Sequence, residues 1–383
     1  MAATLSGATL AACAPSSEDE GSEATGQTSA ASPTVEIDQN FDLDELVEAA
    51  QAEGKKLTVY DSTGAVEDIA ANFEKKYGIE TEGIKSDAPD TVEKMIREAQ
   101  ADNVTVDVAV ISDIASIVNE LFPQEVATNW IPPDLADTIP QKNPLVAVVS
   151  PSVFVYNNET YPDECPISNI WELTEDEWQG NFAMGDPLNE PDLTDWFSEL
   201  TIRGADDLEG AYASQYDETL ETSEENAAWE WIKRLGENQP KIFADEETLV
   251  ASVGVRGQDD PPIGLMSVAK FRDLEDKDYA LEICEVSPWV GYAYPKSIVM
   301  ATGTEAPNSA KLWIHYMMTA EGIEPQVSDG KISGNSDVPL AADDPSGVSE
   351  YLEDLLVFGT DTAQANGQIR PDMQDFWRLS YSG

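Results

Sequence analysis

The stretch Leu57–Gly78, LTVYDSTGAVEDIAANFEKKYG, constrains the fold more than any other part of the sequence. Its first four residues, Leu57–Tyr60, form a short apolar run typical of a β-strand. From Val66 onwards, apolar residues fall at positions 66, 69, 70, 73 and 77, which is the spacing of one helical face. Gly78 is placed to end that helix as a C-terminal cap. This order of strand, polar loop and helix predicts the opening unit of a parallel α/β sheet.

The polar loop between this strand and helix is a candidate binding loop. In open α/β sheets, ligands bind outside the carboxyl ends of the strands. Ser62 and Thr63 would lie at that edge, where free N–H groups and the positive end of the helix favour an anion. The alternative is that Asp61, Ser62 or Thr63 only caps the helix.

A second unit further along the chain repeats this order. The run Val104–Ile111 predicts a strand, and a helix is expected over Ile114–Leu121. Ser112 and Asp113 lie between them. Because the carboxyl ends of parallel strands meet at one sheet edge, the two loops are expected to converge there.

Apolar patterns predict alternating strands and helices along most of the chain. The other predicted strands are Ile79–Ile84, Val146–Tyr156, Asn181–Met184, Leu265–Met266 and Ser297–Ala301. The other predicted helices are Leu43–Glu53, Thr91–Ala101, Glu225–Leu235, Ala306–Thr319, Val348–Phe358 and Asp372–Leu379.

The net charge of the chain restricts the classes of partner that it can bind. Asp and Glu number 74 against 21 Lys and Arg, which gives a formal net charge of −53. Nucleic acid and anionic membrane surfaces need basic patches, so both are excluded as partners. Self-repulsion of this size is relieved by salt, and we interpret it as adaptation to a saline environment. A local cationic pocket for a small anion is still compatible with this charge.

The first forty residues predict an anchor and a tether. Leu10-Ala11-Ala12-Cys13 resembles a bacterial or archaeal lipoprotein signal, so residues 1–13 are interpreted as a signal remnant with lipid on Cys13. The alternative is a chance cysteine in a disordered leader. Residues 14–40 are acidic and rich in Ser, Thr, Ala and Gly, which predicts a disordered linker. The membrane would be contacted through the lipid only.

Four stretches in order resemble a known family: LTVYDSTGAVEDIAANFEKKYGI, VDVAVISD, WELTEDEWQGNFAMGDP and NSAKLWIHYMMTAEGI. They are similar to extracellular solute-binding proteins of ABC importers, in the ferric-ion-binding branch of the type 2 periplasmic binding proteins. The resemblance implies an α/β fold of two lobes with a hinge and a central ligand cleft. It assigns residues 41–156 to lobe 1, with 295–383 returning to it, and 157–294 to lobe 2 and the hinge crossing.

The same resemblance implies a function and partners. It predicts a monomer without enzymatic activity that captures a small solute and releases it to an ABC permease and its ATPase. The location would be extracytoplasmic, at the outer face of the cytoplasmic membrane. Two alternatives remain: a sensor ectodomain and an enzyme of the same fold acting on a small anionic metabolite. The sequence has no G-x-S-x-G, H-E-x-x-H or phosphate-binding P-loop motif, which disfavours the enzyme.

The charge of Lys270 bears on the choice between two ligand classes, a ferric ion and a small anion. Ferric members of the family bind iron with adjacent tyrosines after a P-x-G pattern, which here is Pro262-Ile263-Gly264. The tyrosine positions fall on Ala269 and Lys270, and an ammonium group repels a trivalent cation. Lys270 suits a phosphate or carboxylate better, so Lys270→Glu is expected to abolish anion binding. The alternative is a solvated surface lysine.

Ferric ion remains the alternative ligand, with no other cofactor expected. Its ligands would come from Tyr156, Tyr292 and Tyr294 with Asp113 or Asp186, and the metal-binding set stays unknown. Tyr292 can equally belong to hinge packing, and Asp186 can equally cap a helix.

Cys165 and Cys284 remain once Cys13 is lipidated. Outside the cytoplasm, a pair of cysteines forms a disulfide more often than two free thiols. Both lie near the expected crossing between the lobes, so we predict a Cys165–Cys284 bridge.

Overall fold

The computed structural model describes residues 37–382. Cys13, with its predicted lipid, and residues 14–36 of the predicted linker lie outside this range. Within the described range, no helix is both long enough and apolar enough to cross a membrane.

The strands of the described residues join into one sheet of 12 strands. Their bounds are β1 Leu57–Asp61, β2 Thr81–Lys85, β3 Val108–Ile111, β4 Ala127–Thr128, β5 Val146–Tyr156, β6 Phe182–Gly185, β7 Lys241–Phe243, β8 Ile263–Ser267, β9 Glu282–Ile283, β10 Gly291–Ala301, β11 Ile332–Ser333 and β12 Leu355–Val357. Along the main path the order is β2-β1-β3-β10-β5-β8-β6-β7.

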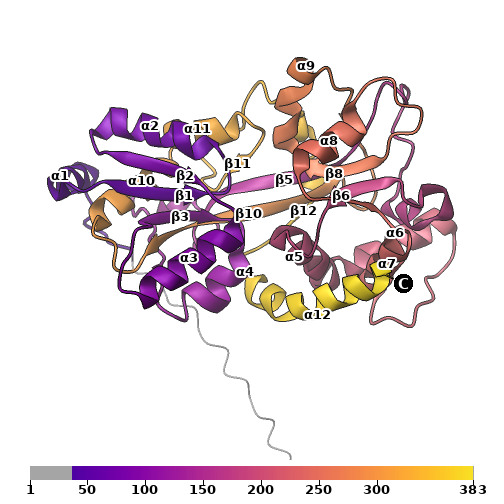
Figure 1. Cartoon of the computed structure of the whole chain (residues 1–383), viewed down its shortest axis with the longest axis horizontal. Helices are drawn as coiled ribbons and strands as arrows, with labels where there is room; N and C mark the ends of the chain where they lie inside the picture. The colour runs from indigo at the N-terminus through magenta and orange to yellow at the C-terminus, as the bar shows by residue number, and fades with distance from the viewer. Residues whose placement is uncertain (1–36, 383) are drawn as a thin grey trace, which may run out of the picture. The chain divides into compact units, whose positions relative to one another are not determined.

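Two parallel sets of strands form the two lobes. Strands β2, β1 and β3 pair in parallel and belong to the first lobe, while β8, β6 and β7 pair in parallel in the second lobe. The two long strands β5 and β10 pair antiparallel and run through both lobes, with β10 joining β3 and β5 joining β8. Figure 1 shows this pair running between the lobes. The two-lobe α/β fold predicted from the resemblance is confirmed.

Helices cover the sheet in both lobes. Their bounds are α1 Leu43–Glu53, α2 Ala65–Tyr77, α3 Ala88–Gln100, α4 Ile114–Ser116, α5 Pro191–Glu199, α6 Ala205–Tyr216, α7 Ala227–Glu237, α8 Glu246–Gly254, α9 Leu274–Lys277, α10 Pro307–Met317, α11 Ala320–Val327 and α12 Ala363–Ser382. A π-helical turn, Ile117–Leu121, continues α4. Helix α2 ends at Gly78, whose φ of 71° is the left-handed conformation that glycine adopts readily.

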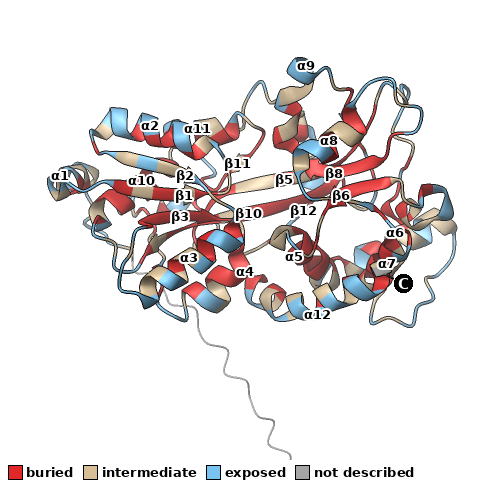
Figure 2. Cartoon of the chain, viewed as in Figure 1, coloured by how far each residue is buried: buried red, intermediate tan, exposed pale blue. Residues whose placement is uncertain are grey.

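Each lobe has an apolar core on both faces of its sheet. In the first lobe, one core joins α1, α2, α10 and α11 to the strands, and the other joins α3 and the π-helical turn Ile117–Leu121 to them. In the second lobe, one core contains α5, α6 and α7, and the other contains α8. Figure 2 shows the strands largely buried and the outer helices exposed along their solvent side. Burial on both faces explains why these strands read as continuous apolar runs in the sequence.

The C-terminal part differs from the sequence-based prediction in two ways. Residues 348–358 were expected to be helical but form two short 3₁₀ turns and strand β12, which pairs with β10. Helix α12 packs against α5 and α7 (Figure 1), and its Met373 and Trp377 lie in the core of the second lobe. Residues 295–383 therefore do not all return to the first lobe. Pairing with β10 outweighs the local helical spacing of residues 348–358, and burial of Trp377 stabilises the packing of α12 on the second lobe.

A disulfide joins Cys165 to Cys284, with the Cα atoms 5.3 Å apart. Cys284 lies just after β9, which pairs with the hinge strand β5. Cys165 follows β5 at the entry to the second lobe. The bridge therefore ties the segment that enters the second lobe to the segment that leaves it.

Candidate functional site

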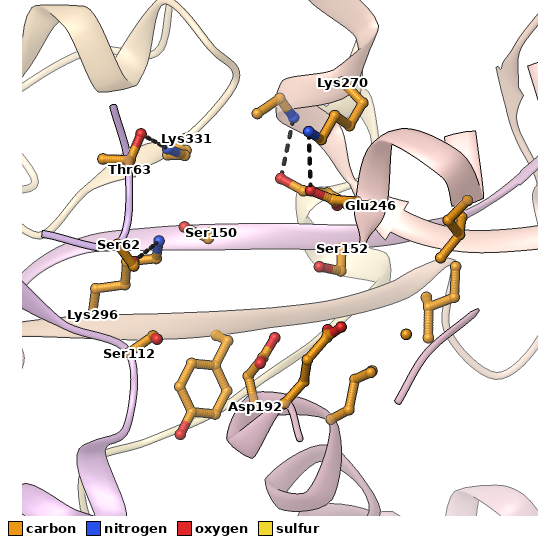
Figure 3. A pocket seen from close by; sticks show the side chains of 18 of the residues that line it. Ser62, Thr63, Ser112, Ser150, Ser152, Asp192, Glu246, Lys270, Lys296 and Lys331 are labelled. Atoms are coloured by element: carbon orange, nitrogen blue, oxygen red, sulfur yellow. Dashed lines mark hydrogen bonds and ion pairs between the residues drawn. The ribbon is translucent and has the colours of Figure 1, made fainter. Parts of the chain in front are cut away.

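A cavity of about 300 Å³ lies between the two lobes. Ser62 and Ser112 line it from the first lobe, and Asp192 and Lys270 line it from the second. Ser150 of the hinge strand β5 lies between these two walls, and Ser152 of the same strand lies on the side of the second lobe (Figure 3). The cavity thus occupies the edge where the carboxyl ends of β1 and β3 meet, which is the usual ligand position in such sheets.

The loop after β1 lines this cavity as predicted. Asp61 ends the strand and is buried, where it accepts hydrogen bonds from Thr63 N–H at 3.1 Å and from Gln326 Nε2 at 2.9 Å. Gly64 occupies the N-cap position of α2 without a side-chain hydrogen bond of its own. The Thr63 hydroxyl accepts the Ala65 N–H only at 3.4 Å. The start of α2 is therefore weakly capped and faces the cavity, where the helix dipole favours an anion.

Two lysines that sequence analysis did not single out lie beside this loop. Lys296 Nζ donates to Ser62 Oγ at 2.8 Å, and Lys331 Nζ contacts Thr63 Oγ1 at 3.5 Å (Figure 3). Lys331 is 5% exposed, and no carboxylate of the described residues forms an ion pair with it. Burial lowers the pKa of Lys331 to about 8, with a further contribution from the positive charge of Lys296.

The cavity concentrates basic residues in a chain that has few. Of the 21 Lys and Arg in the sequence, five line it: Lys85, Lys270, Arg272, Lys296 and Lys331. Two of the five are paired with carboxylates, since Lys270 contacts Glu247 and Arg272 contacts Asp329, each at 2.6 Å. Within residues 37–382, the other three form no ion pair. In a protein of this net charge, unpaired cations in one cavity indicate a site for an anion.

The wall formed by the second lobe carries carboxylates. Glu190 precedes α5 and Asp192 lies in its first turn, and both face the cavity. The Tyr292 hydroxyl donates to Asp192 Oδ2 at 3.2 Å. Burial raises the pKa of Glu190 to about 8, and the neighbouring charges of Asp192 and Glu246 add to that shift.

Lys270 lines the cavity, as predicted, but its ammonium is already engaged. It contacts Glu246 at 3.4 Å (Figure 3) and Glu247 at 2.6 Å. Burial would lower the pKa of Lys270, but these two carboxylates raise it above its ordinary value. Lys270 is therefore neither a solvated surface lysine nor a free cation.

Three predicted site residues lie outside this cavity. Asp113 caps α4, where it accepts from Ser116 N–H at 2.9 Å, and it is bound by Arg370. Asp186 accepts the Leu188 N–H at 2.9 Å in the turn after β6, so its position is that of a local turn-forming residue. Tyr156 lines a separate cavity beside Cys165. A direct ligand role for these three residues stays a prediction.

Of the predicted set, the cavity brings together Ser62, Thr63, Ser112, Lys270 and Tyr292. Tyr292 also stacks on Trp196 and Phe358, with ring centroids 5.3 and 5.7 Å apart, so hinge packing and cavity lining coexist at this residue.

Two of the tyrosines considered as ferric ligands, Tyr292 and Tyr294, line this cavity. No group of three or more His, Cys, Asp or Glu among the described residues could hold a metal ion. The phenols of Tyr292 and Tyr294 hydrogen-bond to Asp192 and Asp195. Burial, together with these carboxylates, raises both tyrosine pKa values well above the ordinary value, which disfavours the phenolate that binds iron.

One signal for Lys296 is visible in the sequence. It is the only charged residue in the buried strand Gly291–Ala301, GYAYPKSIVMA, and a lone lysine inside an apolar strand needs an explanation. Lys331 follows Gly330 in a turn and has no such signal. Glu190 and Asp192 are two of 74 acidic residues, so composition does not distinguish them.

Comparisons with known proteins agree with this architecture. Residues 68–348 match the family model of bacterial extracellular solute-binding proteins. Comparison with curated protein sequences gives no match. Among solved structures, the chain is similar to a substrate-binding protein of an ABC transporter from Agrobacterium tumefaciens, with a TM-score of 0.66 and 14% identity over 87% of this chain and 96% of that one.

Two further solved structures carry different ligands on the same fold. Iron-bound HitA from Pseudomonas aeruginosa gives a TM-score of 0.65 at 12% identity, covering 85% of this chain and 99% of that one. AfuA from Actinobacillus pleuropneumoniae, with fructose-6-phosphate bound, gives 0.63 at 16% identity, covering 85% and 98%. At these identities the likeness shows the fold alone. Together with the family match over most of the sequence, it shows that this chain belongs to the bacterial extracellular solute-binding proteins and has the type 2 periplasmic-binding-protein fold.

Proposed function

We propose that this protein captures a small phosphorylated or carboxylated solute in the cavity between its lobes and delivers it to an ABC permease. Proteins of this family bind solutes for transport and work with a permease and an ATPase; they are not enzymes. The finer statement, that the solute is an anion, rests on the basic residues of the cavity. Capture would follow from tighter binding of the solute to the closed arrangement of the lobes.

The observation that carries this proposal is Lys331. A buried ammonium costs free energy unless a counter-charge compensates for it. Asp61 is the nearby carboxylate, but its hydrogen bonds go to Thr63 and Gln326, and it forms no ion pair with Lys331. A phosphate or carboxylate group placed among Lys331, Lys296 and the start of α2 would supply the missing charge.

Ferric ion is the competing ligand because HitA, a protein of the same fold, is described with iron bound. The cavity of this chain places three unpaired lysines where a trivalent cation would be repelled. A ferric ion held by an anionic chelator could bind the lysines through the carboxylates of the chelator. The iron test should therefore compare ferric citrate with citrate alone.

We also propose that lipid on Cys13 holds the protein at the outer face of the cytoplasmic membrane. This rests on the Leu10-Ala11-Ala12-Cys13 pattern and on the extracellular location of the family. A tethered binding protein meets its permease at a high effective concentration.

A thermal-shift screen in high salt tests the anion proposal. The panel contains phosphate, sugar phosphates, phosphonates, carboxylates, ferric citrate and citrate. A ligand at one hundred times its Kd should add about 2.7 kcal/mol to the free energy of unfolding. Wild type is compared with Lys331→Met and with Lys56→Met, in which an exposed lysine paired with Glu82 is lost.

We expect phosphate- or carboxylate-bearing solutes to raise the Tm of wild type and Lys56→Met but not of Lys331→Met. A shift with ferric citrate and none with citrate or any other anion would overturn the proposal. An unchanged shift in Lys331→Met would remove the observation that carries it.

A further inference from the structure

We infer that the ligand of this cavity carries an ammonium group at the end opposite its phosphate or carboxylate. This inference rests on the proposed function and adds the chemistry of the second wall, where Glu190 and Asp192 lie. The solute would then be a zwitterion of moderate size, with its body lying between the lysines of the first lobe and the carboxylates of the second.

Glu190 is available for a ligand. Its carboxylate forms no ion pair with any residue in the described part of the chain, and its neighbour is the backbone N–H of Asp186. It lies over Gly185, where an added Cβ would come within 2.5 Å of both carboxylate oxygens. The absence of a side chain at position 185 therefore lets this carboxylate fit closely against the end of β6.

Asp192 adds a second charge on the same wall. It accepts one hydrogen bond from Tyr292 at 3.2 Å and has no basic partner among residues 37–382. Glu246 also lines this wall, but it accepts the Ser267 N–H at 2.7 Å and contacts Lys270, so part of its charge is compensated. Asp245 also lines the cavity, but it caps α8 by accepting the Thr248 N–H at 2.8 Å. Glu190 and Asp192 are thus the lining carboxylates that have neither an ion pair nor a helix-capping role, and a cationic group is their complement.

Acidic residues alone would not make a site in a chain with 74 of them. The second observation is Lys331, which lines the same cavity from the opposite lobe, is 5% exposed and lacks an anionic partner. The unpaired cations and the unpaired carboxylates do not form ion pairs with one another across the cavity. Lys331 on one wall and Glu190 and Asp192 on the other have no counter-charge within ion-pair distance, and a solute with an anionic and a cationic group would supply one to each wall.

Burial and neighbouring charges also hold the pKa of Glu190 at about 8, so it is largely protonated at pH 7 in the empty cavity. An ammonium placed beside it would favour the ionised form. Binding of the zwitterion should therefore release a proton from Glu190.

The test compares three phosphonates with the same three-carbon chain by calorimetry at pH 7 in high salt: propylphosphonate, 3-hydroxypropylphosphonate and 3-aminopropylphosphonate. We expect the amino compound to bind at least about tenfold more tightly than the other two. Glu190→Gln should remove most of that preference while leaving the Kd of propylphosphonate within about twofold. The control Glu305→Gln removes one exposed carboxylate, paired with Lys55, and should keep the preference.

The outcomes separate this inference from the proposed function. Equal binding of the three compounds to the wild type would overturn the ammonium subsite while leaving anion capture intact. A preference for the hydroxyl compound would also overturn it, in favour of a polyol. An amino preference that survives in Glu190→Gln and Asp192→Asn would assign it to the net charge of the protein and overturn the subsite. A wild type that binds no phosphonate, phosphate or carboxylate would overturn both proposals.

Discussion

Arg370 and Lys331 are both basic side chains near the boundary between the lobes. The Arg370 side chain is 16% exposed and fully paired, whereas Lys331 is buried and forms no ion pair within residues 37–382. Arg370 lies on α12 and binds Asp113 of the first lobe and Asp195 of the second through four hydrogen bonds of 2.7 to 3.0 Å. Lys331 has one contact with a hydroxyl, at 3.5 Å. The comparison supports the proposal that Arg370 stabilises the fold, whereas Lys331 is left to be compensated by a ligand.

The Arg370 cluster connects segments that are far apart in the sequence. Asp113 also caps α4 through Ser116, and Asp195 accepts the Tyr294 hydroxyl of the hinge strand β10 at 2.7 Å. Burial would raise the pKa of Asp113, but the hydrogen bonds and charge of Arg370 hold it below its ordinary value. The pKa of Asp195, which is 1% exposed, is raised by burial to about 6 in spite of Arg370. This cluster joins α12, both lobes and the hinge.

Removal of the Arg370 charge should have the largest effect. Arg370→Met leaves Asp113 and Asp195 buried without their cation, so the free energy of unfolding should fall by about 3–5 kcal/mol. Urea unfolding in high salt measures it. Arg378→Met, which breaks an exposed pair with Asp375, is the matched control and should cost less than about 1 kcal/mol. A loss for Arg370→Met as small as that of the control would contradict the assignment of this cluster to the fold.

Lys331→Met should affect the ligand and spare the fold. Methionine fills a similar volume without the uncompensated charge, so the free energy of unfolding without ligand should stay constant or rise. The Kd for the anion should rise by about 30- to 1000-fold, which corresponds to about 2–4 kcal/mol. Urea unfolding and calorimetry on one preparation measure both quantities. If stability falls as it does in Arg370→Met, the distinction between the two residues fails.

The pH dependence of binding should sharpen the same distinction. The pKa of Lys331 is about 8 in the free protein, and a bound anion favours its charged form. Affinity should therefore be constant below pH 7 and fall by about tenfold per pH unit above pH 8, because the proton must be taken up on binding. A carboxylate ligand keeps its own charge constant over this range. Lys331→Met should show no such fall, and a wild type without it would contradict the prediction.

The lowered pKa of Lys331 affects stability in the opposite direction: affinity for the anion falls as the pH rises, whereas the free energy of unfolding rises. The ordinary lysine pKa of 10.5 applies to the unfolded chain, which therefore binds the proton more tightly than the folded protein does. Between pH 8 and 10.5, the contribution of Lys331 should make the ligand-free protein more stable as the pH rises. The difference between wild type and Lys331→Met isolates this contribution.

Lys270→Met should have the smallest effect on binding. Because Glu246 and Glu247 already compensate its ammonium, Lys270 should attract a bound anion less strongly than Lys331 does. We expect the Kd to rise by less than about tenfold, and calorimetry measures it. Lys270→Glu, which adds a third negative charge there, should weaken anion binding further. If Lys270→Met loses as much affinity for the anion as Lys331→Met does, Glu246 and Glu247 do not compensate the Lys270 ammonium.

The sequence by itself determined the elements whose signal is local. The apolar spacing of Leu43–Glu53 and Val66–Tyr77 predicted α1 and α2 because each helix buries one face of its own length. The polar residues after β1 and β3 were found because turn residues between apolar runs mark strand ends. Ser62, Thr63 and Ser112 followed from that pattern, and so did the fold class.

Only the tertiary structure decided which charged residues are left without partners. Asp113 looked like a binding residue from its loop, but Arg370, 257 positions away, binds it. Lys331 has no distinguishing signal in the sequence, but the pairing of β11 with β5 places it beside the loop after β1, where its ammonium contacts Thr63. A residue type states which charge is present. The free energy of that charge depends on burial and on neighbours from distant parts of the chain, so the cavity's chemistry becomes defined only when the two lobes come together.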